Sequence, residues 1–156
     1  MIEQRLADFV HASPFFVLGT RDAKLRPHGT HVFGARMDPA ARLLTVFVPQ
    51  VLGGLVLPDL EATKVATVTT GEPVRSETYQ FKGSVTDIRP MTDADFAVQE
   101  IYFAKFTAAV KMMQLPLEQW EVPPARPGIA VTIRVTDIFV QTPGPGAGAR
   151  IGPEPG

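Results

Sequence analysis

The feature that most constrains this chain is a two-residue alternation of apolar and polar side chains in two long segments. In "ETYQFKGSVTDIR" (77–89), Tyr79, Phe81 and Val85 fall on one side. In "IAVTIRVTDIFV" (129–140), the alternating apolar residues are Ile129, Val131, Ile133 and Val135. Because successive side chains of a strand point to opposite faces, both segments are predicted to be strands with one buried face.

Four shorter segments complete the predicted sheet. Residues 15–20, 28–36, 43–48 and 64–70 are short apolar or β-branched runs bounded by turn residues, which is typical of strands. The third of these is close enough to the second to pair with it as a hairpin. Six such strands with only two or three helices predict a mainly β (α+β) fold, an antiparallel six-stranded barrel flanked by helices.

Two segments carry helical periodicity. Residues 2–11 place Ile2, Leu6, Phe9 and Val10 on one face, and residues 93–114 are predicted to form the one long helix, with Thr92 as its N-cap. An apolar stripe in the long helix recurs at helical steps and faces either the core or a partner subunit. The stripe consists of Phe96, Phe103, Phe106, Val110 and Met113.

Length and composition narrow the class of protein. The chain has 156 residues and a formal net charge of −1, which predicts one soluble domain. Basic residues are scattered, so no basic patch for nucleic acid is expected. The absence of cysteine excludes disulfides, cysteine-based zinc sites and thiol catalysis. The longest apolar stretch, 51–57, is far below the ~20 residues of a membrane span, and no targeting segment is apparent, so a cytoplasmic protein is expected.

The last residues have a different composition from the rest. Residues 142–156, "TPGPGAGARIGPEPG", are dominated by glycine and proline. Such a segment buries too little apolar surface to offset the entropy of ordering it. We therefore expect a folded domain over residues 1–141 and a flexible tail over 142–156.

A glycine pair precedes a predicted short helix in "VPQVLGGLVLPDLEATK" (48–64). Free backbone N–H groups at such a turn are a common phosphate site. No lysine or arginine lies between Val48 and Glu61, however. The segment is therefore either a phosphate turn without a cation or a packed apolar turn.

Three segments in this order resemble the pyridoxamine 5′-phosphate oxidase-like, FMN-binding split-barrel superfamily. "RPHGTHVFG" looks like the strand that approaches the flavin, "LLTVFVPQ" with "DLEATKVATV" is similar to the next strand and its connecting helix, and "ETYQFKGSV" is similar to a later strand that ends on glycine. The resemblance spans about residues 2–140. It implies a split barrel that forms a homodimer, with FMN in a cleft between the subunits and a small-molecule substrate.

The resemblance also implies which residues contact the cofactor. They come from the second strand, the end of the third strand with its turn, and the fifth strand. They are His28, Gly29, Thr30, His31, Val48, Pro49, Gln50, Gly53, Gly54, Thr78, Gln80 and Lys82. Of these, Gln80 and Lys82 are ranked highest, as contacts of the ring edge. A metal site built from the two histidines is not expected, because residues three apart on a strand point to opposite faces.

One part of the family pattern is missing. The family places a Ser or Thr and a Lys or Arg in the turn that binds the FMN phosphate, and the corresponding residues here are Gly53, Gly54, Leu55 and Val56. Charge-assisted hydrogen bonds contribute about 1.5–3 kcal/mol each. Losing one or two would weaken FMN binding by about one to three decades. Lys64, Arg26, Arg75 and Lys82 are the candidate replacement cations.

These observations lead to two hypotheses. The first is an FMN-dependent oxidoreductase with an unknown substrate and unknown catalytic residues. The second is a split-barrel dimer that has lost conventional FMN binding and serves as a binding module for haem, deazaflavin or another apolar ligand, with His28 or His31 as the contact. The fold alone does not choose between them.

Overall fold

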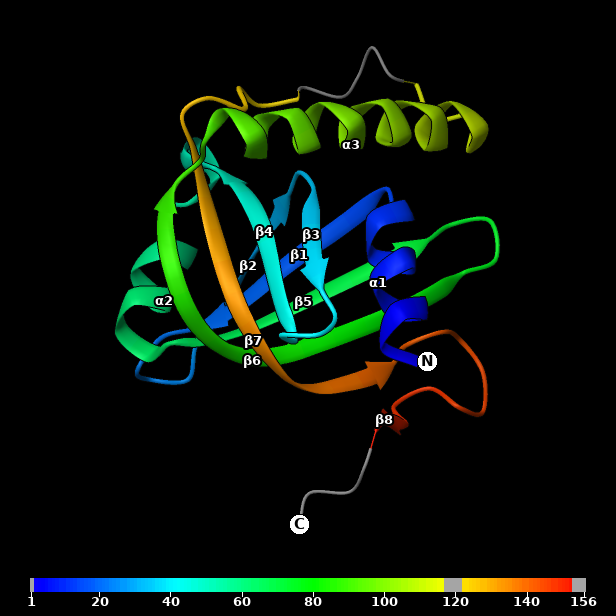
Figure 1. The fold of residues 1–156 in the computed structure, drawn as a ribbon, viewed down its shortest axis with the longest axis horizontal. Helices are drawn as coiled ribbons and strands as arrows, with labels where there is room; N and C mark the ends of the chain where they lie inside the picture. The colour runs from blue at the N-terminus through cyan, green and yellow to red at the C-terminus, as the bar shows by residue number, and fades with distance from the viewer. Residues whose placement is uncertain (1, 117–121, 153–156) are drawn as a thin grey trace.

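The computed structural model describes residues 2–116 and 122–152, which form one curled antiparallel sheet with helices around it (Figure 1). The strands are β1 (Phe15–Arg21), β2 (Pro27–Val32), β3 (Ala35–Asp38), β4 (Leu43–Pro49), β5 (Val65–Glu72), β6 (Glu77–Pro90), β7 (Gly128–Val140) and β8 (Arg150–Ile151). The helices are α1 (Ile2–Ala12), α2 (Val56–Thr63) and α3 (Asp93–Met112), with a 3₁₀ turn η1 (Gln50–Leu52). The strand order is β2-β1-β5-β6-β7-β4-β3, and β8 pairs with β7. The predicted mainly β (α+β) split barrel is confirmed.

The strand predicted over 28–36 is divided by a bend, which raises the strand count above six. Gly34 has a φ of +106°, a conformation that favours glycine. The Phe33 N–H donates to the Phe47 carbonyl (2.9 Å), and the Phe47 N–H donates to the Gly34 carbonyl (3.1 Å). The bend lets β2 pair with β1 while β3 pairs with β4. The predicted hairpin is therefore formed by only the second half of the predicted strand.

The two long alternating strands behave as predicted. On β6, Tyr79, Phe81 and Val85 are buried, and on β7 Val131 and Ile133 are fully buried. β6 and β7 pair over most of their length, with two register shifts that let β6 bend around the barrel. Their inward faces supply much of the core.

The long helix α3 begins at the predicted residue, and its apolar stripe faces the core, which is one of the two alternatives that the sequence left open. Thr92 is its N-cap in a capping box with Asp95, whose side chain also accepts a hydrogen bond from Arg89 (2.5 Å). Burial opposes ionisation of Asp95, but the hydrogen bonds from Arg89 and Thr92 lower its pKa to about 2. From the predicted apolar stripe Phe96, Phe106 and Val110 are buried in the core.

The first helix packs as its periodicity predicts. Leu6 and Val10 are buried, and Phe9 meets the ring of Tyr79 edge to face at 5.0 Å. The side chain of Ile2 lies outside the described residues. α1 is also bonded to the sheet, because the His11 Nε2 accepts a hydrogen bond from the Met37 N–H (3.0 Å).

The predicted flexible tail instead returns to the sheet in the structure. The Gly148 N–H donates to the Val140 carbonyl (2.7 Å), and the two residues of β8 pair with β7. Arg150 forms an ion pair with Asp137 (2.8 Å). Residues 153–156 lie outside the described residues. Among the described helices, none is both long and apolar enough to cross a membrane.

The bond to His11 predicts a pH dependence of stability. Burial and the positive charge of the nearby Lys105 lower the pKa of His11. Only the neutral ring accepts the hydrogen bond from the Met37 N–H. The stability that this hydrogen bond gives the fold is therefore complete above the ordinary histidine pKa of ~6.5. It is lost as the pH falls through the lower pKa that His11 has in the folded protein. His11→Gln keeps an acceptor that does not titrate. In urea unfolding at several pH values between ~7.5 and ~5.5, the variant should lose less stability than the parent protein; equal losses would contradict this role.

Candidate functional site

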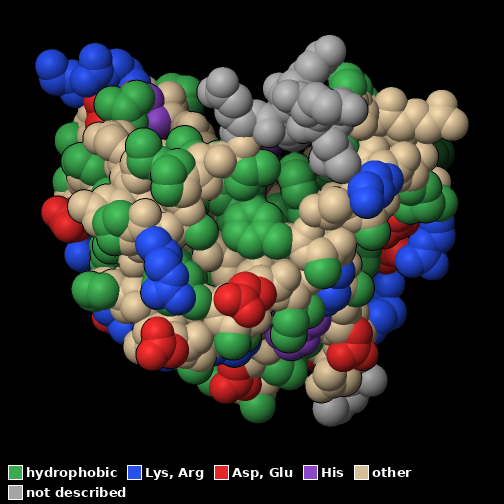
Figure 2. All heavy atoms as spheres, turned by 90° about the horizontal axis from the view of Figure 1, so that it is seen from above, with side chains coloured by type: hydrophobic (Ala, Val, Ile, Leu, Met, Phe, Trp, Pro, Cys, Tyr) green, Lys and Arg blue, Asp and Glu red, His purple; other side chains and the backbone are tan. Residues whose placement is uncertain are grey.

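An aromatic pocket lies where the start of β1, the bend at Phe33 and helix α3 meet. Its volume is about 250 Å³. The lining residues are Phe15, Phe16, His31, Phe33, Leu52, Tyr102, Phe106, Val122 and Pro123. Figure 2, seen from the α3 side, shows hydrophobic side chains around a hollow on this face. Apolar walls with few polar groups are typical of ligand and cofactor sites.

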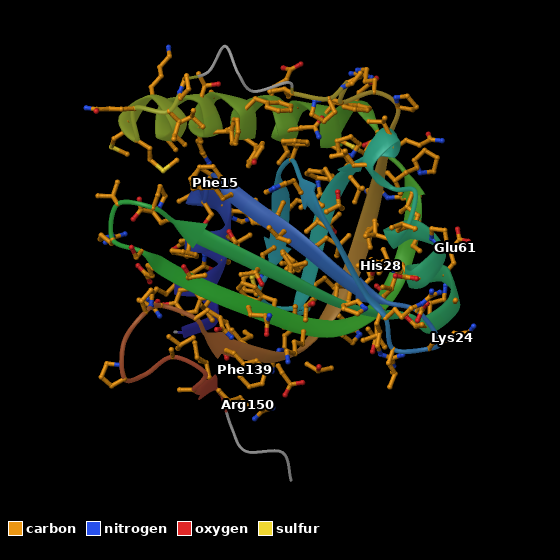
Figure 3. The ribbon with its side chains drawn as sticks, turned by 180° about the vertical axis from the view of Figure 1, so that it is seen from behind. Phe15, Lys24, His28, Glu61, Phe139 and Arg150 are labelled. Atoms are coloured by element: carbon orange, nitrogen blue, oxygen red, sulfur yellow. The ribbon has the colours of Figure 1, made fainter. Side chains whose placement is uncertain are left out.

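The walls of this aromatic pocket are packed against one another. Phe33 stacks on Phe103 with ring centroids 5.4 Å apart, and Tyr102 stacks on Phe106 at 6.1 Å. Phe15 meets Phe106 edge to face at 5.6 Å, and Figure 3 shows Phe15 at the end of β1 beneath α3. Aromatic pairs of this kind hold ring positions, so the pocket presents a preformed flat surface.

Two residues that line the aromatic pocket, His31 and Tyr102, carry polar groups. The imidazole of His31 and the hydroxyl of Tyr102 have no hydrogen-bond partner among the described residues. Burial raises the pKa of Tyr102, so its hydroxyl stays protonated and can donate. A planar apolar ligand with polar atoms on its edge would satisfy both groups. At about 250 Å³ the pocket is slightly smaller than the ~300–1,000 Å³ of typical ligand sites, so it would hold a ring system and leave a longer tail outside.

The histidine at the other end of β2 has a different environment. The buried carboxylate of Asp59, on α2, accepts a hydrogen bond from the Thr20 hydroxyl (2.7 Å) and lies 2.7 Å from His28 Nδ1. The hydrogen bonds from His28 and then from Thr20 lower the pKa of Asp59. Because an ionised carboxylate only accepts, Nδ1 of His28 carries the proton. Figure 3 shows His28 beside α2, at the opposite end of the sheet from Phe15.

The predicted cofactor contacts on β2 therefore lie in two different environments. His28 and Thr30 are half-buried and Gly29 and His31 are exposed, which is the alternation predicted from the sequence. The hydrogen bond from His28 to Asp59 links α2 to the sheet. Of the four β2 residues predicted to contact the cofactor, His31 is the one that lines the aromatic pocket. Asp59 was not among the sequence candidates, because a carboxylate inside an apolar helix has no distinguishing pattern.

The predicted phosphate turn has fewer free backbone N–H donors than the sequence suggested. Val48 is fully buried, so its side chain belongs to the core, and Pro49 is buried as well. The Gly53 N–H donates to the Gln50 carbonyl (3.0 Å), and the Gln50 N–H donates to Pro127 (2.9 Å). Gly54 and the side chain of Gln50 are exposed. Of the two glycine N–H groups expected to face a phosphate, only that of Gly54 remains unbonded among the described residues.

The candidate replacement cations are mostly engaged elsewhere. Arg26 pairs with Asp22 (2.6 Å), and Arg75 lies near Glu72 and Glu77. Lys64 ends α2 in a left-handed conformation. A further cation, Arg126, lies 3.6 Å above the ring of Phe96, next to the proline that bonds the turn. It was missed because the sequence places it far from residues 48–56.

The predicted contacts on β6 lie away from the aromatic pocket. The Lys82 Nζ lies 4.9 Å from the centre of the Phe139 ring, and the Gln80 side-chain amide donates to the Thr69 hydroxyl at 3.5 Å. The Thr78 N–H donates to the Thr142 hydroxyl. Three strand spacings separate β6 from β2, about 14 Å. Within one chain the β6 residues therefore lie on a different part of the sheet from His31. The role predicted for the β6 residues stays a prediction.

Comparison with known proteins identifies the fold. No protein-family model and no curated protein matches the chain. Among solved structures, HupZ of Group A Streptococcus is 21% identical, covers 96% of this chain and 99% of its own, and has a TM-score of 0.57. An F420 reductase is 15% identical (84% and 94% covered, TM-score 0.55), and HutZ, described as the haem storage protein from Vibrio cholerae, is 12% identical (88% and 93% covered, TM-score 0.54). Putative pyridoxamine 5′-phosphate oxidases match as well. At these identities the likeness shows the fold.

The Asp59 network yields a prediction about α2. Replacing Asp59 with Ala leaves the buried Thr20 hydroxyl and His28 without their acceptor, and unpaired buried polar groups are destabilising. We expect a clear fall in the thermal midpoint of Asp59→Ala. Glu61→Ala removes the same charge from an exposed position of the same helix and should change it by less than about 2 °C. Equal effects of the two substitutions would show that the network does not hold α2.

Proposed function

Starting from the split-barrel fold of the pyridoxamine 5′-phosphate oxidase-like superfamily, we propose that this protein binds a flavin ring in the aromatic pocket and is a flavin-dependent oxidoreductase. The observation that carries the proposal is the pocket itself, a cavity of about 250 Å³ with stacked aromatic walls and two unpartnered polar groups. When bound, a flavin supplies the electron transfer. The substrate is a small molecule, and the functional unit is a homodimer, as the resemblance implies.

The residues of this chain would orient the ring and exclude water. Phe33 and Tyr102 are held by stacking, so they offer flat surfaces without rearrangement. His31 and Tyr102 would hydrogen-bond to polar atoms at the edge of the ring. Removing these donors from water strengthens such bonds.

The phosphate end fits FMN less well than the ring end. The described turn has no cation of its own, the N–H of Gly53 is already bonded, and Arg26 and Arg75 are paired. A phosphate group would therefore lie near solvent, with Gly54 as its donor. We infer that most of the affinity comes from the ring.

This inference predicts a low selectivity for FMN over riboflavin, which lacks the phosphate. A site with one or two charged clamps would favour FMN by about one to three decades, whereas here the ratio of dissociation constants should stay below about tenfold. Fluorescence titration of the purified protein with each compound measures the ratio. A protein that is colourless and binds neither compound at high micromolar concentration would overturn the proposed function.

Two single substitutions distinguish the aromatic pocket from the β6 surface. His31→Ala should weaken riboflavin binding because it removes a polar contact of the ring. Lys82→Ala removes a cation that stacks on Phe139, about 14 Å away on the sheet, and should leave binding unchanged. The reverse result would place the ring against β6, as the sequence resemblance implied.

Haem binding is the second candidate. A specific observation supports it, because His31 presents an unpartnered imidazole to an apolar pocket, and imidazole is a common axial ligand of haem iron. Titration with haemin, followed by absorbance, tests this candidate. A Soret shift that is lost in His31→Ala together with no flavin binding would favour the haem-binding module over the oxidoreductase.

A further inference from the structure

We propose that a cavity between α1 and α3 is a second ligand site, which binds a small carboxylate with a short apolar body. The cavity has a volume of about 210 Å³. It is separate from the aromatic pocket, although Phe16 and Tyr102 line both. α1 ends below α3 (Figure 1), and there Lys105 of α3 donates a hydrogen bond to the His11 carbonyl. We call this cavity the α1–α3 pocket.

Most of the side chains around the α1–α3 pocket are apolar. The apolar lining residues are Val10, Phe16, Ala35, Val98 and Ile101. Val10, Phe16 and Ala35 are buried, whereas Ile101 is 60% exposed and therefore lies where the pocket meets solvent. Buried apolar walls favour hydrocarbon over water, so the matching ligand has an apolar body.

Two polar lining residues, Lys105 and His11, carry hydrogen-bond donors. Lys105 is half-buried, and its ammonium has three N–H groups, of which one donates to the His11 carbonyl. The His11 Nε2 accepts from the Met37 N–H (3.0 Å), so the neutral ring carries its proton on Nδ1. Among the described residues, neither that Nδ1–H nor the other two N–H groups of Lys105 have a partner.

The charges near these donors are mainly positive. Burial lowers the pKa of His11, and the positive charge of Lys105 lowers it further. Arg36 acts in the same direction and Asp8 in the opposite one. Arg36 is itself paired with Asp95 (3.4 Å), so Lys105 is the cation that can bind an anion. The lining residues include no carboxylate within the described chain, and an ionised carboxylate, which only accepts, matches the unpartnered donors.

The volume limits the ligand to a small molecule. About 210 Å³ equals the space of about seven water molecules at ~30 Å³ each, and it lies below the ~300–1,000 Å³ of drug-sized ligands. A chain of about six carbon atoms or one benzene ring would occupy this space, with its carboxylate beside Lys105. For a ligand of this size we expect a dissociation constant of about 1 mM.

Titration of the isotope-labelled full chain with hexanoate, followed by amide NMR without flavin, tests the site. Hexanoate should shift signals of α1 and α3 residues around the pocket until they saturate. Hexanamide has the same shape without the charge and should bind roughly 3- to 30-fold more weakly. A parallel titration with benzoate shows whether the site prefers a chain or a ring, and either preference supports a carboxylate site.

Substitutions at the pocket separate charge recognition from apolar contact. Lys105→Met keeps most of the stem and should weaken hexanoate binding roughly 3- to 30-fold, with little effect on hexanamide. Lys111→Met is the matched control, because Lys111 is an exposed lysine of the same helix outside the pocket lining. Ile101→Asp places a negative charge at the exposed mouth and should weaken hexanoate binding more than Ile101→Asn, which loses the same apolar contact.

Three results would overturn the second site. They are the absence of saturable shifts at tens of millimolar hexanoate, equal affinities for hexanoate and hexanamide, and unchanged hexanoate binding by Lys105→Met. Thermal unfolding checks that this variant keeps its fold, and the Ile101 pair gives the same test at an exposed position. His31→Ala alters the aromatic pocket and should leave hexanoate binding intact; a loss would place the carboxylate in that pocket instead. Because flavin is absent, the result is independent of the proposed function.

Discussion

The rest of the structure depends on the bend at Phe33 and Gly34. Two hydrogen bonds join this bend to Phe47, so β2 and β4, which lie far apart in the strand order, approach each other. A side chain at Gly34 would stand 3.3 Å from both Phe47 and Tyr102, and the positive φ there suits only glycine. The same bend aims Phe33 at α3, where its ring forms one wall of the aromatic pocket. The approach of β2 to β4 and the formation of the aromatic pocket therefore have one cause.

The parts of the fold that follow local rules could be predicted from the sequence. The alternation of β6 and the capping residue Thr92 of α3 are local patterns, and both were predicted correctly. The division of β2 from β3 was not, because one glycine within an apolar run does not distinguish a bend from a strand. β8 was missed for a related reason. This strand is held in place by its pairing with β7 and by the Arg150–Asp137 ion pair. The Gly/Pro-rich composition of the segment indicates neither contact.

The candidate site was harder to predict because it is assembled from distant segments. His31 was identified through its strand, but the partners that make it a pocket residue come from β1 and α3. His28 looked equivalent in sequence, yet a bond to Asp59, 31 residues away, gives it a structural role. The sequence has no lysine or arginine between Val48 and Glu61, and the structure adds that the Gly53 N–H is bonded to the Gln50 carbonyl. Contacts between residues this far apart in the chain leave no local pattern in the sequence.

α3 connects the aromatic pocket to the surface of the molecule. Tyr102 and Phe106 on its inner side form a wall of the aromatic pocket, while Ile101 and Ala104 lie on its outer side, within one helical turn of them. A helix is rigid over this distance, so any contact that fixes the outer side also fixes the ring positions inside. Conversely, a ligand that stacks on Tyr102 would reduce the motion of α3 as a whole, and part of its binding free energy would offset the entropy that this ordering costs.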